Sequence, residues 1–410
     1  MRFKSYKAVR FDYAATTLTK ELLSTFRDMI NDAIRICIEE DVHGRLPLRN
    51  RIYKEFQERY AVLSGYPYSV AEIAWSIVKK HKKWGRKPVA SRLMMKMDSQ
   101  NYRFVDGILS LPFRKGEPIV IPLKQGAYQR RFLTDPSLTR GSITITESAI
   151  FIAFSKVVTP VVPIARVGID LNEKSAVCSD GSKYDLSEVV RLHTEYAVRR
   201  TDFERRHPQD RRLRHKFAGS RREKARIRQI LHNTAKRIVE DAKRGGKSIV
   251  LERLKQIQRT HLRGNGEGRR KRGRIQKWPF SLLQNYVAHN AAWEGVQVEL
   301  VNAAWTSKLC NNCGHLNRDL KPSERGWRCP SCGADLDRDL NAAINIERRG
   351  NIACLGEVRP GAQGTNEAVK GNETTKAPIL QAEAVKSTLR PSKGKPLEGS
   401  LGAQNQWLQN

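Results

Sequence analysis

Acidic residues far apart in the chain stand where a carboxylate could do chemistry. Asp170 closes the apolar run VGID, and Glu252 lies inside the apolar run IVLERL. A third acidic group, Asp337 and Asp339, opens the segment DRDLNAAINI. Carboxylates gathered at the end of a sheet can hold two Mg²⁺ ions about 3.5–4 Å apart, an arrangement that hydrolyses phosphodiester bonds. These residues are therefore candidates for a two-metal site.

Each acid also has a simpler explanation when it is taken alone. Asp170 could be a turn residue, and Glu252 could face water from an edge strand. A carboxylate inside a buried strand is costly unless it is paired or bound to a metal. The position of Glu252 therefore needs an explanation that its own segment does not supply.

Four of the seven cysteines form two close pairs, Cys310-x-x-Cys313 and Cys329-x-x-Cys332, separated by 15 residues. This is the spacing of a four-cysteine zinc ribbon, in which each tight turn directs two thiolates at one tetrahedral ion. Gly314 and Gly333 follow the two pairs, where such a turn needs a residue that tolerates positive φ. We expect one structural Zn²⁺ that stabilises folding and performs no chemistry.

The charge of the chain favours a polyanionic partner. Its 410 residues contain 75 Lys and Arg against 42 Asp and Glu, a formal net charge of +33. Nucleic acid is the usual partner of such a surplus, although a ribosome-associated protein would share it. A membrane-surface protein is disfavoured because no basic amphipathic segment adjoins an apolar stretch.

The strongest local surplus lies between Arg199 and Lys247, with 18 Lys and Arg against 6 Asp and Glu, and a second cationic segment spans 263–277. Phosphate contacts explain such an excess better than a solvated helical surface does. The candidate nucleic-acid-binding residues are Arg211, Arg212, Arg221, Arg222, Lys224, Arg226, Arg269, Arg270, Lys271 and Arg272.

Hydropathy predicts where the protein works. No stretch approaches the roughly 18–20 apolar residues of a membrane-spanning helix. The N-terminal segment lacks the apolar core of a signal peptide. We therefore expect a cytoplasmic protein with reduced thiols and no membrane partner, associated with the nucleoid when it is bound to DNA.

The elements that must position these residues follow from periodicity. Apolar residues at helical spacing predict a helix from an N-cap at Thr19 to Cys37, with further helices near 49–64 and 69–84. Strand patterns cover the start of the chain, the segment 119–123 and a hairpin that turns at Glu147-Ser148. We predict further strands at 167–170, 175–179, 248–254 and 296–301. Helices are predicted within 186–244 and at 280–293, and a mostly disordered tail at 351–410.

A family resemblance joins these separate motifs. Asp170 in GIDLN, Glu252 in VLERL, the cysteine ribbon and the closing DRDLNAAINI resemble, in order and spacing, the RuvC-like nuclease of transposon-encoded TnpB proteins. Those proteins are relatives of the compact type V CRISPR effectors. The resemblance is specific over about 165–347 and looser over 1–160.

The resemblance implies a fold. The expected architecture is a multidomain α/β protein, in which an RNase H-like (RuvC) nuclease domain carries an inserted four-cysteine zinc ribbon and follows an N-terminal β-barrel-like wedge with a helical insertion. The implied boundaries are 1–16 and 100–162 for the wedge, 17–99 for the helical recognition insertion, 163–308 and 335–349 for the nuclease, 309–334 for the ribbon and 350–410 for the tail.

The resemblance also implies an activity and names Asp170, Glu252 and Asp339 as the catalytic acids, with Asp339 preferred over Asp337 in the D-x-D-x-N pattern. The expected protein is an RNA-guided endonuclease that binds a transposon-derived guide RNA and a short motif beside its double-stranded DNA target. It cuts with two Mg²⁺ ions, and a monomer is the favoured state. Arg253 departs from the family pattern, which has an acidic or small polar residue after the glutamate.

Other functions remain open on the sequence. The same fold without cleavage could serve as an RNA-guided DNA-binding repressor, and the same carboxylates could support strand transfer by a transposase. A basic RNA-binding protein with a zinc ribbon would explain the charge and the cysteines. It would leave the ordered set of acids unexplained.

Overall fold

The computed structural model describes residues 2–60, 65–81, 88–114, 117–210, 213, 221–254, 278–321, 323–352 and 354. The predicted cationic segment 263–277 and nearly all of the predicted tail lie outside these residues. Across the ranges that the structure describes, no helix is both long and apolar enough to cross a membrane.

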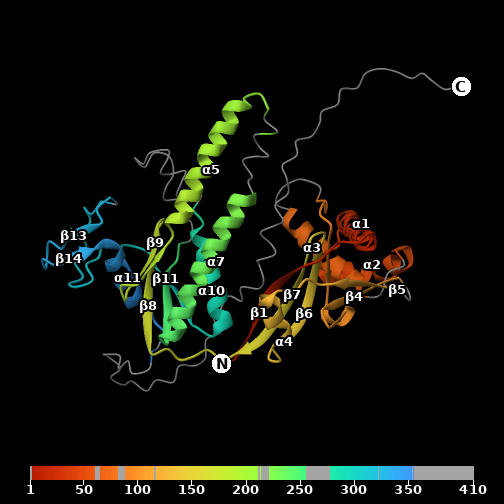
Figure 1. Ribbon diagram of the computed structural model, residues 1–410, viewed down its shortest axis with the longest axis horizontal. Coiled ribbons are helices and arrows are strands. Elements are labelled where there is room, and N and C mark those ends of the chain that lie inside the picture. Colours follow the sequence, from red (N-terminus) through yellow and green to blue (C-terminus); the bar gives the residue numbers. More distant parts are fainter. Residues whose placement is uncertain are drawn as a thin grey trace. The chain divides into compact units, whose positions relative to one another are not determined.

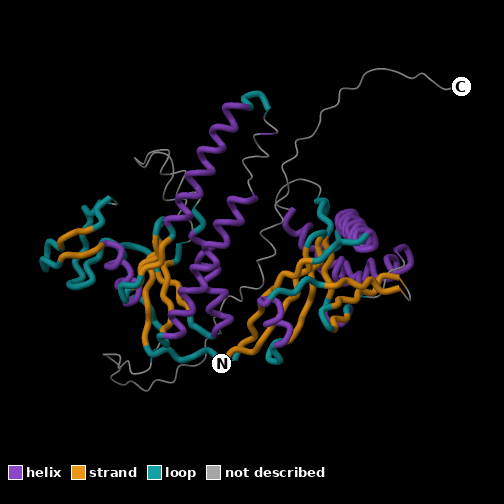
Figure 2. The backbone as a smooth tube through the Cα atoms, viewed as in Figure 1, coloured by secondary structure: helices purple, strands orange, loops and turns teal. Residues whose placement is uncertain are grey.

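The N-terminal half contains two antiparallel sheets (Figures 1 and 2). The larger sheet has the order β1 (Phe3–Asp12), β7 (Ala149–Val158), β6 (Thr139–Thr146) and β2 (Met94–Met97). The smaller one joins β3 (Arg103–Val105), β4 (Ile108–Arg114) and β5 (Glu117–Pro122), and short helices lie at η1 (Ser99–Asn101) and α4 (Ala127–Thr134). The predicted hairpin is confirmed, because β6 and β7 pair directly across Glu147-Ser148. Strand β2 falls in the range predicted as helical insertion, yet it pairs with β6 at the edge of the larger sheet.

Three helices pack on these strands: α1 (Thr17–Glu39), α2 (Arg45–Tyr60) and α3 (Tyr66–His81). The apolar residues at helical spacing in α1 are buried, as predicted. The predicted cap at Thr19 is wrong, because the helix begins one turn earlier. The Thr16 hydroxyl accepts the backbone N–H of Thr19 at 3.2 Å, which leaves Thr19 inside the first turn.

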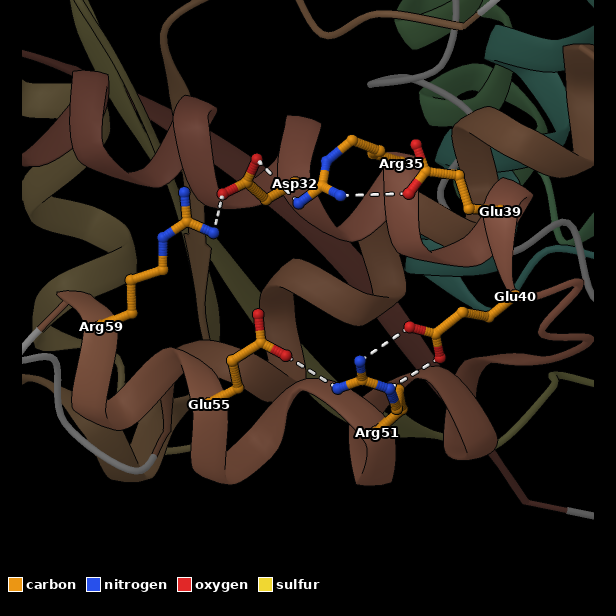
Figure 3. Close-up of polar contacts among 7 residues, drawn as sticks. All are labelled: Asp32, Arg35, Glu39, Glu40, Arg51, Glu55 and Arg59. Carbon is orange, nitrogen blue, oxygen red and sulfur yellow. Dashed lines mark hydrogen bonds and ion pairs between the residues drawn. The ribbon is translucent and has the colours of Figure 1, made fainter.

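The outer surfaces of α1 and α2 carry a ladder of exposed ion pairs (Figure 3). Arg51 lies 2.7 Å from Glu40 and 2.8 Å from Glu55, and Arg59 lies 3.0 Å from Asp32. Exposed pairs of this kind contribute little stability. They do neutralise the arginines, so this surface is balanced in charge within a very basic chain.

A five-stranded mixed sheet follows, in the order β10 (Lys183–Asp185), β9 (Ser175–Cys178), β8 (Ala165–Leu171), β11 (Lys247–Glu252) and β12 (Val298–Val301). Strands β8, β11 and β12 run parallel to one another. Strand β9 is antiparallel to β8, and β10 is antiparallel to β9. Its helices are α5 (Ser187–Arg206), α7 (Arg221–Arg244), α10 (Phe280–Glu294) and α11 (Arg338–Arg348) (Figure 1). The predicted strands and helices of this region are confirmed.

The two faces of this sheet carry different residues. Ile169 and Leu251 pack in the cluster that contains residues of α7 and α10. Val250 lies instead against Ile346 of α11. Because side chains alternate along a strand, Asp170 in β8 and Glu252 in β11 belong to the face that α11 covers.

The close approach of α11 to β8 depends on Gly168. A Cβ atom at this position would lie 2.1 Å from the carbonyl oxygen of Ala343 and 2.4 Å from the backbone nitrogen of Glu347. Both are backbone atoms, so the conflict could be relieved only by moving the helix. Glycine at 168 therefore sets how near the later turns of α11 come to the middle of β8.

The substitution Gly168→Ala should lower the free energy of unfolding by about 1–3 kcal/mol, since an added methyl group forces the helix away from the strand. Urea denaturation of the purified chain measures this free energy of unfolding. Gly141→Ala is the matched control, because its Cβ would meet its nearest neighbour at 3.4 Å, an ordinary contact. Equal stability of the two variants would contradict the argument.

Candidate functional site

Asp170 is a buried carboxylate near the end of β8, with 7% of its surface exposed. Its one hydrogen bond among the described residues comes from the Asn172 side-chain amide, at 2.7 Å from Oδ2. Burial first, and then the negative charges of Glu252 and Asp339, raise the pKa of Asp170 to about 8. The structure thus brings Glu252 and Asp339 close enough to Asp170 for their charges to act on it.

Glu252 is the last residue of β11, one position beyond the Leu251–Ile169 pair that joins β11 to β8. Burial raises the pKa of this carboxyl group, and a hydrogen bond from Thr306 together with the charge of Arg349 opposes the rise. The Thr306 hydroxyl donates to Oε1 of Glu252. The glutamate therefore points into the protein and does not face water from an edge strand.

Asp339 lies in the first turn of α11, whose N-cap is Asp337. The Asp337 side chain accepts the backbone N–H of Asp339 at 3.0 Å and that of Leu340 at 2.8 Å. Both carboxylate oxygens of Asp339 accept from Nη1 of Arg325, at 2.9 and 3.1 Å. Asp337 thus has a structural task, and Asp339 is the acid that lies near Asp170.

The acids fit a hard divalent cation by their chemistry. Glu252 and Asp339 lie near the buried Asp170. A cation would compensate the mutual repulsion of these three carboxylates. The carboxylate oxygens of the three acids do not all lie within 4.8 Å of one another. Among the described residues, only the Sγ atoms of the four cysteines lie that close together. The Asp339 carboxylate is paired instead with the Arg325 guanidinium.

Two buried asparagines support the loop beside these acids, a role that was not predicted from the sequence. Asn341 and Asn345 of α11 are almost fully buried, and both donate to the Leu309 carbonyl, at 2.8 and 2.6 Å. Asn345 also donates to the Thr306 carbonyl at 2.9 Å. The only signal was two polar residues four apart on the apolar face of a helix.

The four-cysteine cluster has the geometry of a zinc site. The Sγ atoms lie 3.8 Å apart for Cys310 and Cys332 and 3.6 Å apart for Cys313 and Cys329. A tetrahedral Zn²⁺ with Zn–S bonds of about 2.3 Å places its sulfurs about 3.8 Å apart. The strands β13 (Gly326–Arg328) and β14 (Asp335–Asp337) pair beside the cluster.

The turns of the cluster have the predicted backbone. Gly314 and Gly333 have φ values of +77° and +70°, as expected after each cysteine pair. The backbone N–H of Ala334, and then the Asn312 amide, lower the pKa of the Cys332 thiol to about 6. These donors favour the thiolate that binds metal.

The predicted nucleic-acid contacts are only partly within the described residues. Arg222, Lys224 and Arg226 lie exposed on α7, and Arg226 is 3.9 Å from Glu188. The side chains of Arg211, Arg212, Arg221, Arg269, Arg270, Lys271 and Arg272 lie outside the described residues.

Comparison with known proteins shows two regions of similarity. Residues 280–346, which include α10, the cysteine cluster and most of α11, match the family described as Cas12f1-like, TNB domain. The TnpB-like protein MJ0751 of Methanocaldococcus jannaschii is 29% identical over 248 residues, which cover 56% of this chain and 86% of that protein. The chain is therefore similar to TnpB-like proteins and to the Cas12f1-like TNB domain.

Other similar proteins match over smaller shares of their length. A putative RNA-guided DNA endonuclease of Streptomyces pristinaespiralis is 30% identical over 200 residues, which cover 48% of this chain and 40% of that protein. A Cas12f1 structure, in complex with sgRNA and target DNA, aligns with a TM-score of 0.54 and 15% identity over 81% of this chain and 83% of that one. This second likeness concerns the fold alone.

We expect the purified chain to contain one Zn²⁺ per molecule, because a closed four-thiolate site is structural. Replacing one ligand, in Cys310→Ser, should remove the metal and lower the thermal midpoint. Elemental mass spectrometry and a thermal melt measure both. Cys178→Ala, at a buried thiol outside the cluster, is the control that should keep its zinc. Full zinc content in Cys310→Ser would contradict the assignment.

Proposed function

We propose that this protein is a member of the TnpB family and an RNA-guided DNA endonuclease. In this proposal it binds a transposon-derived guide RNA, recognises a short motif beside a double-stranded DNA target and hydrolyses the DNA with two Mg²⁺ ions. The observation that supports it best is the buried Asp170 carboxylate beside Glu252 and Asp339. The name of the Streptomyces relative supports the class of activity.

The strand order supports an RNase H-like (RuvC) nuclease domain. Strand β8, which carries Asp170, is central, with β9 and β10 antiparallel on one side and β11 and β12 parallel on the other. Carboxylates near the ends of the adjacent parallel strands β8 and β11 meet at one edge of the sheet. In the proposal the ribbon is inserted in this domain, and the N-terminal sheets form the wedge.

The residues of the chain divide the work of hydrolysis. When bound, the Mg²⁺ ions supply electrostatic stabilisation of the reacting phosphate and activation of water. Asp170, Glu252 and Asp339 would together hold the ions. To do so, Asp339 would have to release the Arg325 guanidinium, because that guanidinium contacts both of its carboxylate oxygens.

The charge distribution supports a path for nucleic acid along α7. Its exposed Arg222 and Lys224 belong to the most basic stretch of the chain. The ion-pair ladder on α1 and α2 is the contrasting surface, since its arginines already contact carboxylates (Figure 3). A polyanion gains more from the first surface than from the second.

The substitution Asp170→Ala should reduce DNA cleavage by at least about 100-fold, since several kcal/mol of metal-dependent stabilisation are lost. Binding of guide RNA and target should persist. Incubation with co-purified RNA, a matched duplex and Mg²⁺, followed by gel analysis, measures cleavage, and filter binding measures affinity. Glu147→Gln, on the exposed β6–β7 turn, is the control.

The same assay separates the alternatives. Cleavage by Asp170→Ala at the wild-type rate would refute the assigned site. Tight binding without cleavage by the wild-type chain would favour a repressor. Joined DNA products would favour a strand-transfer transposase.

The double substitution Arg222→Ala/Lys224→Ala should weaken RNA binding and reduce the slope of log K against log salt by up to about 1 per lost phosphate contact. Fluorescence anisotropy at several salt concentrations measures the slope. Arg51→Ala is the control, because Arg51 already pairs with Glu40 and Glu55. Equal slopes for the two variants would remove α7 from the proposed path.

A further inference from the structure

The loop 302–311 leads from β12 to the zinc cluster and contacts Glu252 on the way. Thr306 in this loop is buried, with 3% of its surface exposed. Its Oγ1 donates to Glu252 Oε1, and the other acceptor within reach, the Ala303 carbonyl, is 3.3 Å away. A hydroxyl has one proton, so the shorter contact to the carboxylate takes it.

The backbone around Thr306 is held by α11. Asn345 Nδ2 lies 2.9 Å from the Thr306 carbonyl oxygen and 2.6 Å from that of Leu309. Asn341 accepts the backbone N–H of Asn311 at 2.8 Å through Oδ1 and donates to Leu309 through Nδ2. These amides satisfy buried backbone groups that would otherwise be costly, and they leave the loop little freedom.

Both ends of the loop are also anchored. Cys310, a member of the zinc cluster, lies between Leu309 and Asn311. At the other end, Arg349 Nη1 donates to the carbonyls of Asn302 and Ala304, at 2.6 and 2.8 Å. The position of the Thr306 hydroxyl is therefore set by the cysteine cluster and α11 together.

We infer that Thr306 is a positioning residue for Glu252, which it holds in the orientation that binds the divalent cation. The inference rests on the proposed function. A free glutamate side chain loses rotamer entropy when it binds a metal, and a fixed donor on one oxygen removes part of that cost beforehand. Among the described residues Oε2 receives no hydrogen bond, so it stays available to the cation.

The contacts also give the zinc cluster a second task. The cluster holds the Cys310 end of the loop, the loop holds the Thr306 hydroxyl, and the hydroxyl holds the carboxylate. A structural metal held by the cysteines would thereby help to fix the orientation of Glu252.

Mn²⁺ binding to the full chain tests the inference without any measure of cleavage. The signal of free aqueous Mn²⁺ in electron paramagnetic resonance reports binding directly. Thr306→Val, which keeps the shape and removes the donor, should weaken Mn²⁺ binding about 10-fold or more. Thr306→Ser, which keeps the hydroxyl, should bind within about two-fold of wild type.

Zinc content and thermal midpoint show whether each variant is folded. If Thr306→Val loses zinc or unfolds, Thr306→Ala replaces it with the same expectation. Wild-type Mn²⁺ binding in a folded variant without the hydroxyl would overturn the inference. Equal weakening in Thr306→Ser would also overturn it, since the methyl group and not the donor would then matter.

Glu252→Gln separates the two levels of the argument. Strong loss of Mn²⁺ binding in Glu252→Gln, with no loss in Thr306→Val, would reject the positioning role and leave the proposed metal site standing. Unchanged Mn²⁺ binding in Glu252→Gln would reject the proposed metal site and the positioning role with it.

Discussion

Helix α11 can lie against β8 only because residue 168 has no side chain. This contact carries Asp339 in the first turn of the helix toward Asp170 near the end of the strand. The same helix presents Asn341 and Asn345 to the loop that holds Thr306. One close approach of backbone to backbone therefore supports both the meeting of the acids and the orientation of Glu252.

Two physical effects disfavour the charged form of Asp170. Burial and mutual repulsion raise the pKa of Asp170, so the charged form is disfavoured without a counter-charge. The protein supplies only partial compensation, through Asn172, Thr306 and Arg325. Under the proposed function the remaining compensation comes from divalent cations, so the mutual repulsion of the carboxylates favours metal binding.

Charge is organised on the surface as well as in the site. Arg51 and Arg59 on α2 contact nearby acids, whereas exposed Arg222 and Lys224 on α7 lie in the most basic stretch of the chain. Total charge therefore indicates a polyanionic partner but does not locate it. The distribution over particular helices gives the proposed path its direction.

The sequence by itself determined the local elements and the cysteine cluster. Periodicity is a short-range property, so the helices and strands around Asp170, Glu252 and the ribbon could be predicted, and the C-x-x-C turns needed glycine for a backbone reason that φ values confirm. Helix starts were less certain, because Thr16 and Thr19 are equally good caps in sequence and only the hydrogen bond distinguishes them. The tertiary structure alone decided the burial of Asp170, the pairing of Arg325 with Asp339 and the contact of Thr306 with Glu252. The two contacts join residues that are 14 and 54 positions apart. No local sequence pattern records which distant surfaces a packed fold brings together.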